Sequence, residues 1–521
     1  MRKRVLVAKR VVVICLCLAM IAAFSGCGKG SDSSSNAEGS ADEVQEITLA
    51  FWDADQALAG DEVLEKVESE LNIKIKPVNV SWDDYAQKIQ LWGASGSLPD
   101  VFVGDIRNSK MFAEWASQGI IKAIPEDLSQ YPNLETYLSD EATTNSARID
   151  GTLFCIPRKS YPAQEWTAMD REIVYRWDLA QAAGITKEPE TWEEFDTMIQ
   201  AIIAADPDKT SIQGMTSGTT GFFARMFLPY ASSIACDMDK WVQNEDGTYE
   251  PAYFAEDLTP AFQLMRDLYT SGTIEKDIAL TDNQTAREKF LQGKSAAIFI
   301  GGGIGKDNYT NVAKYWKEIH GEDYLADVKV LKLMPDVDGN PTYPIVDFAW
   351  SETYINASVT DQKMDKILQL FEYLLTEEGS IYTTYGPEGS LYDMVDGQIT
   401  LHEDADILGT YPSIGVFKDM VQWSPSSYSE VYPLDEPIEY KQINQEIVEQ
   451  AKTVEIPEYN SKCAQIVKEL GLGLSNGMED DVINIMTGQD PVDQMWDEIY
   501  KQYQNKGLDD VVQQVNDSLN S

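Results

Sequence analysis

Aromatic and acidic side chains follow two predicted strands at positions where ligands can bind. Residues 47–53 (ITLAFWD) and 100–103 (DVFV) have the length and apolar content of strands. Trp52 and Asp53 end the first strand, and Asp105 follows the second. In open α/β sheets, ligands lie beyond the carboxyl ends of the strands. We therefore consider these three side chains as ligand contacts, with core packing as the alternative for the indole ring.

The sequence contains few of the histidines on which many catalytic sites depend. His320 and His402 are its only histidines, so histidine metal sites and Ser/His triads are poorly supported. The 86 Asp and Glu residues could always supply the carboxylate pair that a glycosidase needs. Because acids are so abundant, no single pair among them is informative. The residue types therefore favour a binding protein over an enzyme.

A glycine-rich segment at 301–306 (GGGIGK) begins like a phosphate-binding loop. Ile300 stands where a Walker loop needs Gly, and Asp307 stands where it needs Ser or Thr. The dinucleotide-binding pattern fails as well, because Lys306 takes the place of its last Gly. A loop that brings the backbone close to a ligand in a cleft is the better interpretation, and no cofactor is expected.

The acidic segment at 336–340 (DVDGN) begins like a calcium loop. Pro341 replaces the turn Gly of such a loop, and Asp347 replaces its final Glu. A tight turn between strands that end at Leu333 and begin near Tyr343 is the better interpretation. The sequence therefore predicts no metal site.

The first 26 residues have the succession of a secretory signal. The first ten carry five Lys or Arg and no acid, and the next 14 are almost wholly apolar. The sequence SGC ending at Cys27, with the polar tract after it, resembles the lipobox of bacterial lipoproteins, in which this cysteine is acylated. The apolar run falls short of the roughly 20 residues that a membrane-spanning helix needs. We expect a signal peptide at 1–26, a lipid on Cys27 and a disordered tether over 27–45.

The chain is strongly acidic, with a formal net charge of -45. Phosphate binding needs clustered Lys and Arg, so nucleic acid and anionic lipid surfaces are poor partners. Three cysteines follow the tether, Cys155, Cys236 and Cys463, and they form no CxxC pair. In an exported protein this argues against a disulfide framework and a zinc site, and it predicts buried free thiols.

Strands and helices alternate through the first part of the chain. A helical pattern runs through 63–67, and residues 73–78 (IKIKPV) alternate as a half-exposed strand. Trp82 and Tyr85 open the next helix, with Ile89 on the same side. This alternation predicts a doubly wound α/β lobe, and the chain is long enough for two such cores.

Three later segments point to a particular family. A strand reading GTLFCIP at 151–157 is followed by YRWDL at 175–179. Next comes TWEEF at 191–195, in which Thr191 and Glu194 have the spacing of a capping box before an apolar helix face. In this order the segments resemble the family 1 extracellular solute-binding proteins, the carbohydrate-binding components of ABC importers.

Segments further along the chain agree with that resemblance. GKSAAIF at 293–299 resembles the family's GKAAM strand, and residues 361–375 have the pattern of an amphipathic helix. YGPEGSLY at 385–392 and the close that begins with TGQDP at 487–491 resemble the LplA-like lipoprotein branch. The resemblance covers nearly all of residues 46–521.

The fold that this resemblance implies is an α/β fold of two lobes, the type II periplasmic-binding-protein fold. Both lobes are expected to be discontinuous in sequence and joined by hinge strands. The expected boundaries are an N-terminal lobe of 46–157 plus 296–345 and a C-terminal lobe of 158–295 plus 346–521. The chain would cross between the lobes near 157–161, return near 294–297 and cross last near 344–348.

The function that the resemblance implies is capture of a sugar, with an oligosaccharide favoured, by hinge closure. The closed protein would deliver the sugar to the permease subunits of an ABC importer that has a cytoplasmic ATPase. We expect a monomer, lipid-anchored on the extracytoplasmic face of the cell membrane. Sugars need flat aromatic rings for their C–H faces and planar polar groups for their hydroxyls. The candidate ligand contacts are Trp52, Asp53, Trp82, Asp105, Arg158, Trp166, Trp350, Glu388 and Trp423.

Two alternatives from other classes remain open at this point. One is a solute-binding lipoprotein for peptides or another non-sugar ligand, and the other is a surface-anchored glycan-active enzyme. Turnover of a glycan would establish the enzyme, and loss of affinity on capping peptide termini would support the peptide binder. Among sugars, the acidic composition counts against a polyanionic ligand unless Arg158, Lys159 and their neighbours line the cleft.

Overall fold

The first of two main sheets is built around strand β1 (Gln45–Trp52), and its strand order in the computed structural model is β2-β1-β3-β13-β6. Strand β1 pairs in parallel with β2 (Ile73–Val80) and β3 (Val101–Gly104). Strand β13 (Ala349–Ile355) is antiparallel to β3 and to β6 (Ile156–Lys159). The carboxyl ends of β1, β3 and β6 therefore share one edge of the sheet with the beginning of β13.

The structure describes most of the chain after the predicted tether. The described residues are 43–52, 54–81, 84–107, 109–218, 240–255, 257–301, 312–336, 339–343, 345–346, 349–402, 405–421, 438–456, 458–472 and 478–520.

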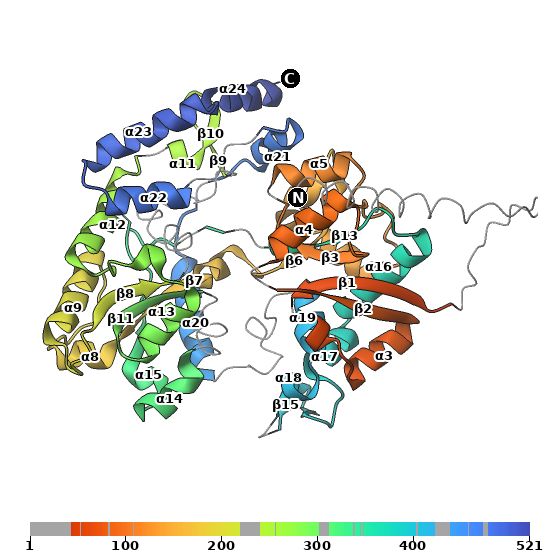
Figure 1. Ribbon diagram of the computed structural model, residues 1–521, viewed down its shortest axis with the longest axis horizontal. Helices are drawn as coiled ribbons and strands as arrows, with labels where there is room; N and C mark the ends of the chain where they lie inside the picture. Colours follow the sequence, from red (N-terminus) through yellow and green to blue (C-terminus); the bar gives the residue numbers. More distant parts are fainter. Residues whose placement is uncertain are drawn as a thin grey trace, which may run out of the picture. The chain divides into compact units, whose positions relative to one another are not determined.

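Helices cover both faces of the five-stranded sheet. In Figure 1, α4 and α5 lie on one side of it, and α3, α17 and α19 lie on the other. The helices of this lobe are α2 (Ala54–Ala57), α3 (Glu62–Leu71), α4 (Tyr85–Ser95), α5 (Lys110–Ser117), α6 (Pro132–Leu138), α7 (Glu141–Thr144), η1 (Asn145–Ala147), α16 (Asp361–Leu375), α17 (Glu377–Tyr385), α18 (Ile407–Thr410) and α19 (Ile414–Val421). Two small hairpins accompany them, β4 (Arg148–Ile149) with β5 (Thr152–Leu153) and β14 (Tyr392–Val395) with β15 (Gln398–Leu401).

Local sequence explains why these elements form where they do. In β2, Ile73 and Ile75 are buried while the lysines beside them are exposed, which is the alternation of a strand with one covered face. Helix α3 begins at Asp61, whose carboxylate accepts a 2.9 Å hydrogen bond from the Leu64 amide. Helix α16 has the predicted bounds of 361–375, and its apolar stripe lies in the core of this lobe.

The second main sheet has four strands in the order β12-β7-β11-β8. Its strands are β7 (Arg171–Arg176), β8 (Gln213–Ser217), β11 (Ser295–Gly301) and β12 (Val328–Val330). Alternate residues of β7 enter two separate core clusters, because neighbouring side chains of a strand point to opposite faces. Ile173 and Tyr175 belong to one cluster, and Val174 belongs to the other.

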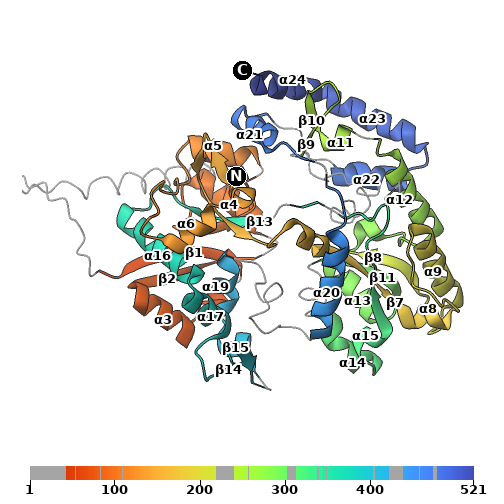
Figure 2. The same ribbon diagram turned by 180° about the vertical axis from the view of Figure 1, so that it is seen from behind.

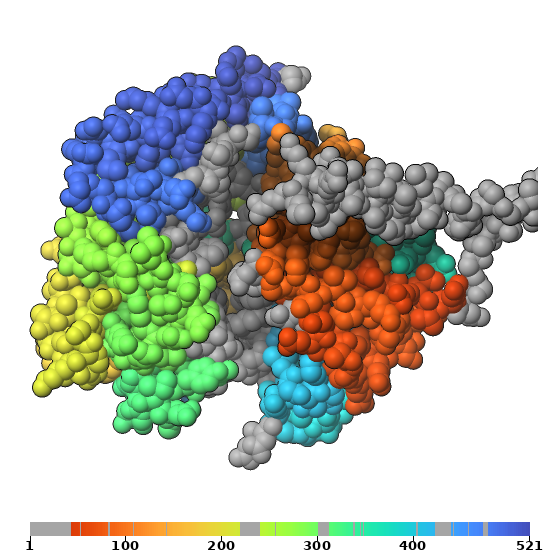
Figure 3. All heavy atoms as spheres, in the orientation of Figure 1, coloured from red at the N-terminus to blue at the C-terminus, as the bar shows by residue number. Residues whose placement is uncertain are grey.

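Helices pack on both faces of this second sheet. Figure 2 shows α9 and α20 on opposite sides of it, and Figure 3 shows the blue C-terminal helices against the green α12. The helices of this lobe are η2 (Gln164–Met169), α8 (Trp177–Ala182), α9 (Trp192–Ala205), α11 (Ala252–Ala255), α12 (Thr259–Ser271), η4 (Ile278–Leu280), α13 (Asn283–Leu291), α14 (Lys314–His320), α15 (Tyr324–Asp327), α20 (Ile438–Ala451), α21 (Ser461–Glu469), α22 (Met478–Thr487), α23 (Val492–Asn505) and α24 (Leu508–Leu519). A small hairpin of β9 (Trp241–Gln243) and β10 (Tyr249–Pro251) belongs to the same lobe.

The predicted capping box at the start of α9 is half formed. Thr191 Oγ1 accepts a 3.2 Å hydrogen bond from the Glu194 amide, as predicted. The Glu194 carboxylate, however, accepts from the amide of Glu190 rather than from that of Thr191. The helix still begins at the predicted place, because the cap satisfies the amide groups that its first turn leaves without partners.

The second sequence segment that was expected for each lobe is wrong. Strand β11 pairs with β7 and β8, so the segment 296–345 belongs to the second sheet and its core rather than to the N-terminal lobe. Conversely, β13 and α16 to α19 belong to the first lobe. Much of the segment 346–521 is therefore part of the first lobe rather than of the C-terminal lobe. The physical reason is that side chains of β11 point alternately to the two faces of the second sheet. Both faces are covered, so the whole apolar run of β11 is buried.

The crossings between the lobes follow from this correction. The first crossing is where it was predicted, because β6 ends at Lys159 and the second-lobe core includes Ala168. Ile345 belongs to the second core and Ala349 begins β13 in the first sheet, so these residues lie on the two sides of the last predicted crossing, near 344–348. The expected return near 294–297 does not occur. Helix α19 belongs to the first core and α20 to the second, so the chain changes lobe once more between these helices, which was not predicted from the sequence.

Two predicted buried thiols are confirmed in the part of the chain that the structure describes. Cys155 and Cys463 are buried and free, and burial raises the pKa of the Cys155 thiol well above its ordinary value. Cys236 lies outside the described residues. Within the described ranges, no helix combines the length and apolar character that crossing a bilayer requires.

Candidate ligand-binding site

Two indole rings meet at the shared edge of the five-stranded sheet. Trp52 is the last residue of β1, and Trp350 is the second residue of β13. Their ring centroids lie 5.4 Å apart and their planes differ by 8°. The Tyr85 ring meets Trp52 edge-on at 5.6 Å. All three side chains are half-buried, so they present an aromatic surface that remains partly open.

A β-bulge brings Trp350 to this position. The pairing of β13 with β6 shifts register between Ala349 and Glu352. Ser351, inside the bulge, has a φ of 60°, which costs a residue with a Cβ roughly 1–2 kcal/mol. Its side chain is fully buried. Bulges of this kind re-aim a neighbouring side chain, and here that neighbour is Trp350.

Arg107 holds the bulge on both sides. Its Nη2 donates a 2.9 Å hydrogen bond to the carbonyl of Ala349, before the bulge. Its Nε lies 3.0 Å from Oε1 of Glu352, after the bulge. Both side chains are almost fully buried, and Tyr354 donates a 2.7 Å hydrogen bond to the other oxygen of Glu352. A buried ion pair needs such additional partners, because removing two charges from water is costly.

Arg158 holds the bulge from the neighbouring strand. Its Nε donates to the carbonyl of Trp350 at 3.3 Å, and its Nη1 donates to the carbonyl of Asp419 in α19 at 3.2 Å. Its guanidinium carbon lies 5.0 Å from the ring centroid of Trp52 and 4.7 Å from that of Trp350. Ser160 completes the support, because its Oγ accepts a 3.1 Å hydrogen bond from the amide of Trp350.

Burial and mutual charge shift the pKa values of these groups. Burial raises the pKa of Glu352 to about 7, against the opposing effect of Arg107. Burial, followed by the charges of Asp105 and Glu352, raises the pKa of Tyr85 to about 12. Burial lowers the pKa of Arg158 to about 10, so this arginine stays charged at neutral pH. The charge of Asp105, an exposed residue directly after β3, acts on Tyr85, Glu352 and Arg158.

The structure brings together four of the predicted ligand contacts. They are Trp52, Asp105, Arg158 and Trp350, and whether they bind a ligand stays a prediction. Trp166 is elsewhere, in η2, where it packs half-buried against the second-lobe core.

The other predicted contacts do not join this group. Glu388 is exposed in the turn between α17 and β14, and its charge acts on Tyr392 in the hairpin there. Asp53, Trp82, Trp423 and the proposed lipid site Cys27 lie outside the described residues.

Besides the four predicted contacts, the site contains residues that were not predicted. Tyr85 was noted only as the start of a helix, and Arg107, Ser160, Ser351, Glu352 and Tyr354 were not noted. One signal was available, a glutamate that is the single charged residue of strand 349–355 and that needs a partner once the strand is buried. The positive φ of Ser351 left no signal, because serine is not a residue that marks a left-handed conformation.

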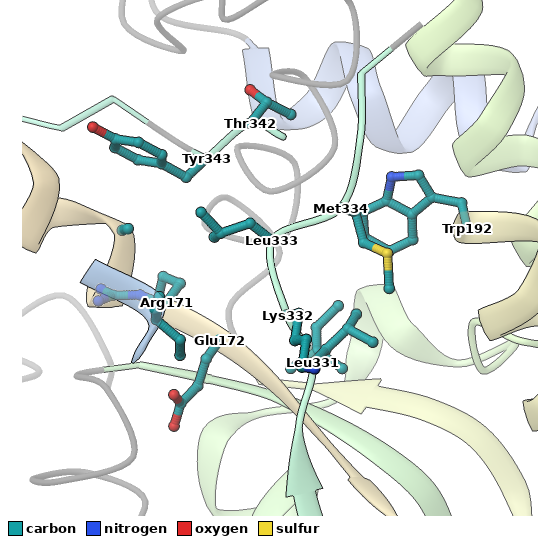
Figure 4. Close-up of a pocket in the computed structure, with 12 residues that line it drawn as sticks. Arg171, Glu172, Trp192, Leu331, Lys332, Leu333, Met334, Thr342 and Tyr343 are labelled. Atoms are coloured by element: carbon teal, nitrogen blue, oxygen red, sulfur yellow. The ribbon is translucent and has the colours of Figure 1, made fainter. Parts of the chain in front are cut away.

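A small pocket lies in the second lobe, close to the last crossing. Figure 4 shows Leu333 and Met334 running between Trp192 and Tyr343, which contribute to its walls. Its cavity volume is about 40 Å³, which is room for a water molecule or two but not for a sugar ring. We therefore do not treat it as the ligand site.

The residues on either side of positions 337 and 338 pair with each other, but the strands predicted to end at Leu333 and to begin near Tyr343 are not formed: β12 ends at Val330, and the described residues 339–343 belong to no named strand. The Asp336 amide donates to the carbonyl of Asn340 at 2.7 Å, and Pro335 bridges to Pro341 in antiparallel fashion. Across the residues the structure describes, no three His, Cys, Asp or Glu side chains gather as a metal site would require. Nearly all of the glycine-rich segment 301–306 lies outside those residues.

The sheet order, with one antiparallel strand inserted among parallel ones, and the connections between two α/β lobes define a class of binding protein. Residues 53–381, more than half of the chain, match the family model described as bacterial extracellular solute-binding protein. The chain belongs to this family. Its characterised members are binding proteins, and the match extends over parts of both lobes.

Individual relatives are more distant. The chain is 25% identical over 415 residues to the polygalacturonan/rhamnogalacturonan-binding protein YtcQ of Bacillus subtilis, covering 76% of this chain and 77% of that protein. It is 22% identical over 390 residues to lipoprotein LipO of the same organism, covering 72% of each.

Solved structures confirm the two-lobed fold. The substrate-binding protein FusA of S. pneumoniae, in complex with kestose, superposes with a TM-score of 0.68 at 14% identity, covering 91% of this chain and 98% of FusA. An extracellular solute-binding protein from Bifidobacterium longum subsp. infantis superposes with a TM-score of 0.65 at 15% identity, covering 92% and 98%. At these identities the likeness establishes the fold.

Proposed function

We propose that this protein captures an oligosaccharide outside the cell and delivers it to an ABC importer. The observation that carries the proposal is the stack of Trp52 and Trp350 at the sheet edge where ligands bind in α/β folds. Half-buried indole rings offer flat apolar surfaces to the C–H faces of a sugar. Asp105 is exposed directly after the neighbouring strand β3, and a carboxylate there could accept hydrogen bonds from sugar hydroxyls.

The names of several relatives support a sugar as the ligand. One B. subtilis relative is named for polygalacturonan and rhamnogalacturonan binding, and another is a galactooligosaccharide-binding protein. FusA, a relative in sequence as well as in fold, is a fructooligosaccharide ABC transporter substrate-binding protein. These ligands differ, so the relatives support the class of ligand rather than one sugar.

The proposed mechanism is closure of the two lobes on the sugar. The chain passes from one sheet to the other after β6 and again before β13, so both connections end beside the Trp350 group. A sugar that contacts both lobes would stabilise the closed form by its differential affinity for the two forms. The permease would recognise that closed form. Small-angle scattering should therefore show a smaller radius of gyration with bound ligand than without it.

The proposed location is the extracytoplasmic face of the membrane, with a lipid on Cys27 as anchor. The basic and apolar signal, the SGC sequence and the likeness to lipoprotein LipO support this proposal. The protein would act as a monomer that binds its ligand without turning it over.

The experiment that tests the function is thermal unfolding of the purified protein against oligosaccharides, monosaccharides and short peptides. A ligand at about 100 times its Kd adds roughly 2.7 kcal/mol to the free energy of unfolding, which raises the melting temperature measurably. Stabilisation by one class of oligosaccharide, with the sugar recovered unchanged, is the expected result. Stabilisation by peptides alone, or release of shorter sugars, would contradict the proposal.

A further inference from the structure

Described residues flank three connections between the two lobes. The first connection follows Lys159 at the end of β6, and the second ends at Ala349, where β13 begins. The third follows Val421 at the end of α19, since the next helix, α20, packs in the second core. A rotation of one lobe against the other must therefore bend or twist the chain at these three places.

The side chain of Tyr137, in α6, joins the first and third connections. Its hydroxyl oxygen lies 2.7 Å from the carbonyl oxygen of Pro157 in β6 and 2.6 Å from that of Val421. The same hydroxyl accepts a 2.8 Å hydrogen bond from the amide of Lys159. One hydroxyl group therefore contacts the backbone of both elements where the chain is about to leave the first lobe.

This hydroxyl has one hydrogen for two carbonyl acceptors. Burial raises the pKa of Tyr137 above its ordinary value, so the hydroxyl keeps that hydrogen at neutral pH. The ring itself is half-buried and packs against the first-lobe core. Because the O–H bond can turn, the hydrogen can pass from the Pro157 carbonyl to the Val421 carbonyl without movement of the ring. The contact can therefore follow a change in the angle between the two connections.

The second connection is joined to the other two by Arg158 of β6 and by Ser160. Arg158 donates to the carbonyl of Trp350 at 3.3 Å and to the carbonyl of Asp419 in α19 at 3.2 Å. Ser160 Oγ accepts a 3.1 Å hydrogen bond from the amide of Trp350. All three connections are thus tied together inside the first lobe, next to the indole pair.

We propose that Tyr137 is a positioning residue for lobe closure, because its hydroxyl makes the first and third connections move together. The inference rests on the proposed function and concerns how closure is controlled. Without the hydroxyl, the two connections would move independently, and the unliganded protein would populate more arrangements of its lobes. A sugar that needs one arrangement then binds more weakly, in proportion to the lower population of that arrangement.

The test compares two tyrosine variants of the first lobe. Tyr137→Phe keeps the ring and removes the hydroxyl that joins the connections. Tyr131→Phe is the matched control, because the Tyr131 hydroxyl, at the N-cap of the same helix, donates to the Asp365 carboxylate in α16. Each change removes hydrogen bonding from the first lobe, so both variants should lose a similar amount of stability in thermal unfolding.

The first measurement is isothermal titration calorimetry with kestose, galactotriose, xylotriose and trigalacturonate as probes. For every probe that binds the parent, Tyr137→Phe should raise Kd about threefold to tenfold, which is the effect of roughly one net hydrogen bond on an equilibrium. Tyr131→Phe should leave the Kd of the same probe unchanged, because its hydroxyl holds a helix pair within one lobe. The indole rings are intact in both variants, so a rise in Kd does not reflect a lost sugar contact.

The second measurement is small-angle scattering, with and without a saturating probe. Unliganded Tyr137→Phe should have a larger radius of gyration than the parent and the control, because its lobes populate more open arrangements. When saturated with the sugar, the three proteins should have the same radius of gyration. A role confined to the stability of the first lobe would not change the unliganded radius.

The outcomes separate this inference from the function on which it rests. If Tyr137→Phe matches the parent in Kd and in unliganded radius, the inference is overturned and sugar capture stands. An equal rise in Kd in both variants would overturn it as well, because general loss of lobe stability would explain both. If no probe binds the parent, the proposed function fails, and the unliganded radius alone decides the inference: an unchanged radius in Tyr137→Phe overturns it.

Discussion

Trp52 and Trp350 are nearly parallel, with ring centroids 5.4 Å apart, although they come from β1 and β13, which belong to two separate segments of the first lobe's sequence. Arg158 lies beside both rings and donates a hydrogen bond to the backbone of the second. The aromatic surface is therefore part of a rigid network of buried charges. Binding sites on such supported elements keep their geometry better than sites on loops.

Replacement of Trp350 by Ala should weaken sugar binding by about tenfold or more, because it removes one face of the aromatic pair. Since the ring is half-buried, the melting temperature of the free protein should change little. Calorimetry and thermal unfolding measure the two effects separately. Trp241→Ala is the matched control: this indole is 1% exposed in the second lobe, so its loss should cost about 3–5 kcal/mol of stability. A large loss of unliganded stability in Trp350→Ala would show that this ring is part of the core.

Replacement of Ser351 by Gly should stabilise the protein, because glycine adopts a φ of 60° without steric cost. Ser351→Ala is the control, since it removes the same hydroxyl but keeps the Cβ. We expect the Gly variant to exceed the Ala variant by about 1 kcal/mol in urea unfolding. If the Ala variant is as stable as the Gly variant, the backbone at this position is not strained.

Replacement of Arg107 by Met should destabilise the protein by about 3–5 kcal/mol, because it leaves the Glu352 carboxylate buried without its cation. The double variant Arg107→Met, Glu352→Leu should recover part of that loss, since both charges are then absent. Urea unfolding of both single variants and the double variant gives the coupling energy. A double variant that loses as much as the two single variants combined would contradict the role of the pair.

Replacement of Glu352 by Gln should flatten the dependence of stability on pH. The pKa of Glu352 is raised from 4.5 to about 7, so between these values the folded state holds a proton that the unfolded state has lost. The raised pKa of Glu352 therefore contributes to the free energy of unfolding in full below pH 4.5. As the pH rises to about 7, this contribution, on the order of 3 kcal/mol, is lost. Comparing the parent and the Gln variant at pH 5 and 7.5 isolates this group. Equal pH dependence in the two proteins would argue against the raised pKa.

Replacement of Cys27 by Ala should release the protein from membranes, because the proposed lipid anchor cannot form without this thiol. Partition into a detergent phase after expression in a bacterial host measures the effect. Cys463→Ala, at a buried free cysteine of the second lobe, should partition like the parent. If Cys27→Ala also stays with the detergent phase, the anchor is elsewhere.

Much of the fold could be predicted from local patterns in the sequence. The alternation of Ile73 and Ile75 with exposed lysines predicts β2, and the stripe of 361–375 predicts α16 at its observed bounds. The assignment of β11 was wrong, because an apolar strand is equally suited to either sheet. Which sheet it joins depends on pairing with β7 and β8, which are distant in the sequence, and periodicity carries no information about those partners.

The candidate site was predicted only in part. Trp52, Asp105 and Trp350 could be found because strand ends are where ligands bind, and because aromatic residues there can contact sugars. The supporting pair of Arg107 and Glu352 could not be found, since the match of two charges across the fold is a tertiary property. The bulge at Ser351 could not be predicted either, because it depends on the tertiary contacts of Arg107 and Glu352.

The position of β13 in its sheet has a consequence for the timing of folding. Arg158 and Trp350 are 192 residues apart, yet the strands that carry them are neighbours. Among the described strands, β6 pairs in this sheet with β13 alone. At about 5–20 residues per second, a ribosome needs roughly 10–40 s to add the partner of β6 after β6 itself has been made. Throughout that interval the sheet of the amino-terminal lobe lacks the partner of β6, so this lobe can complete its sheet only after most of the chain has been made.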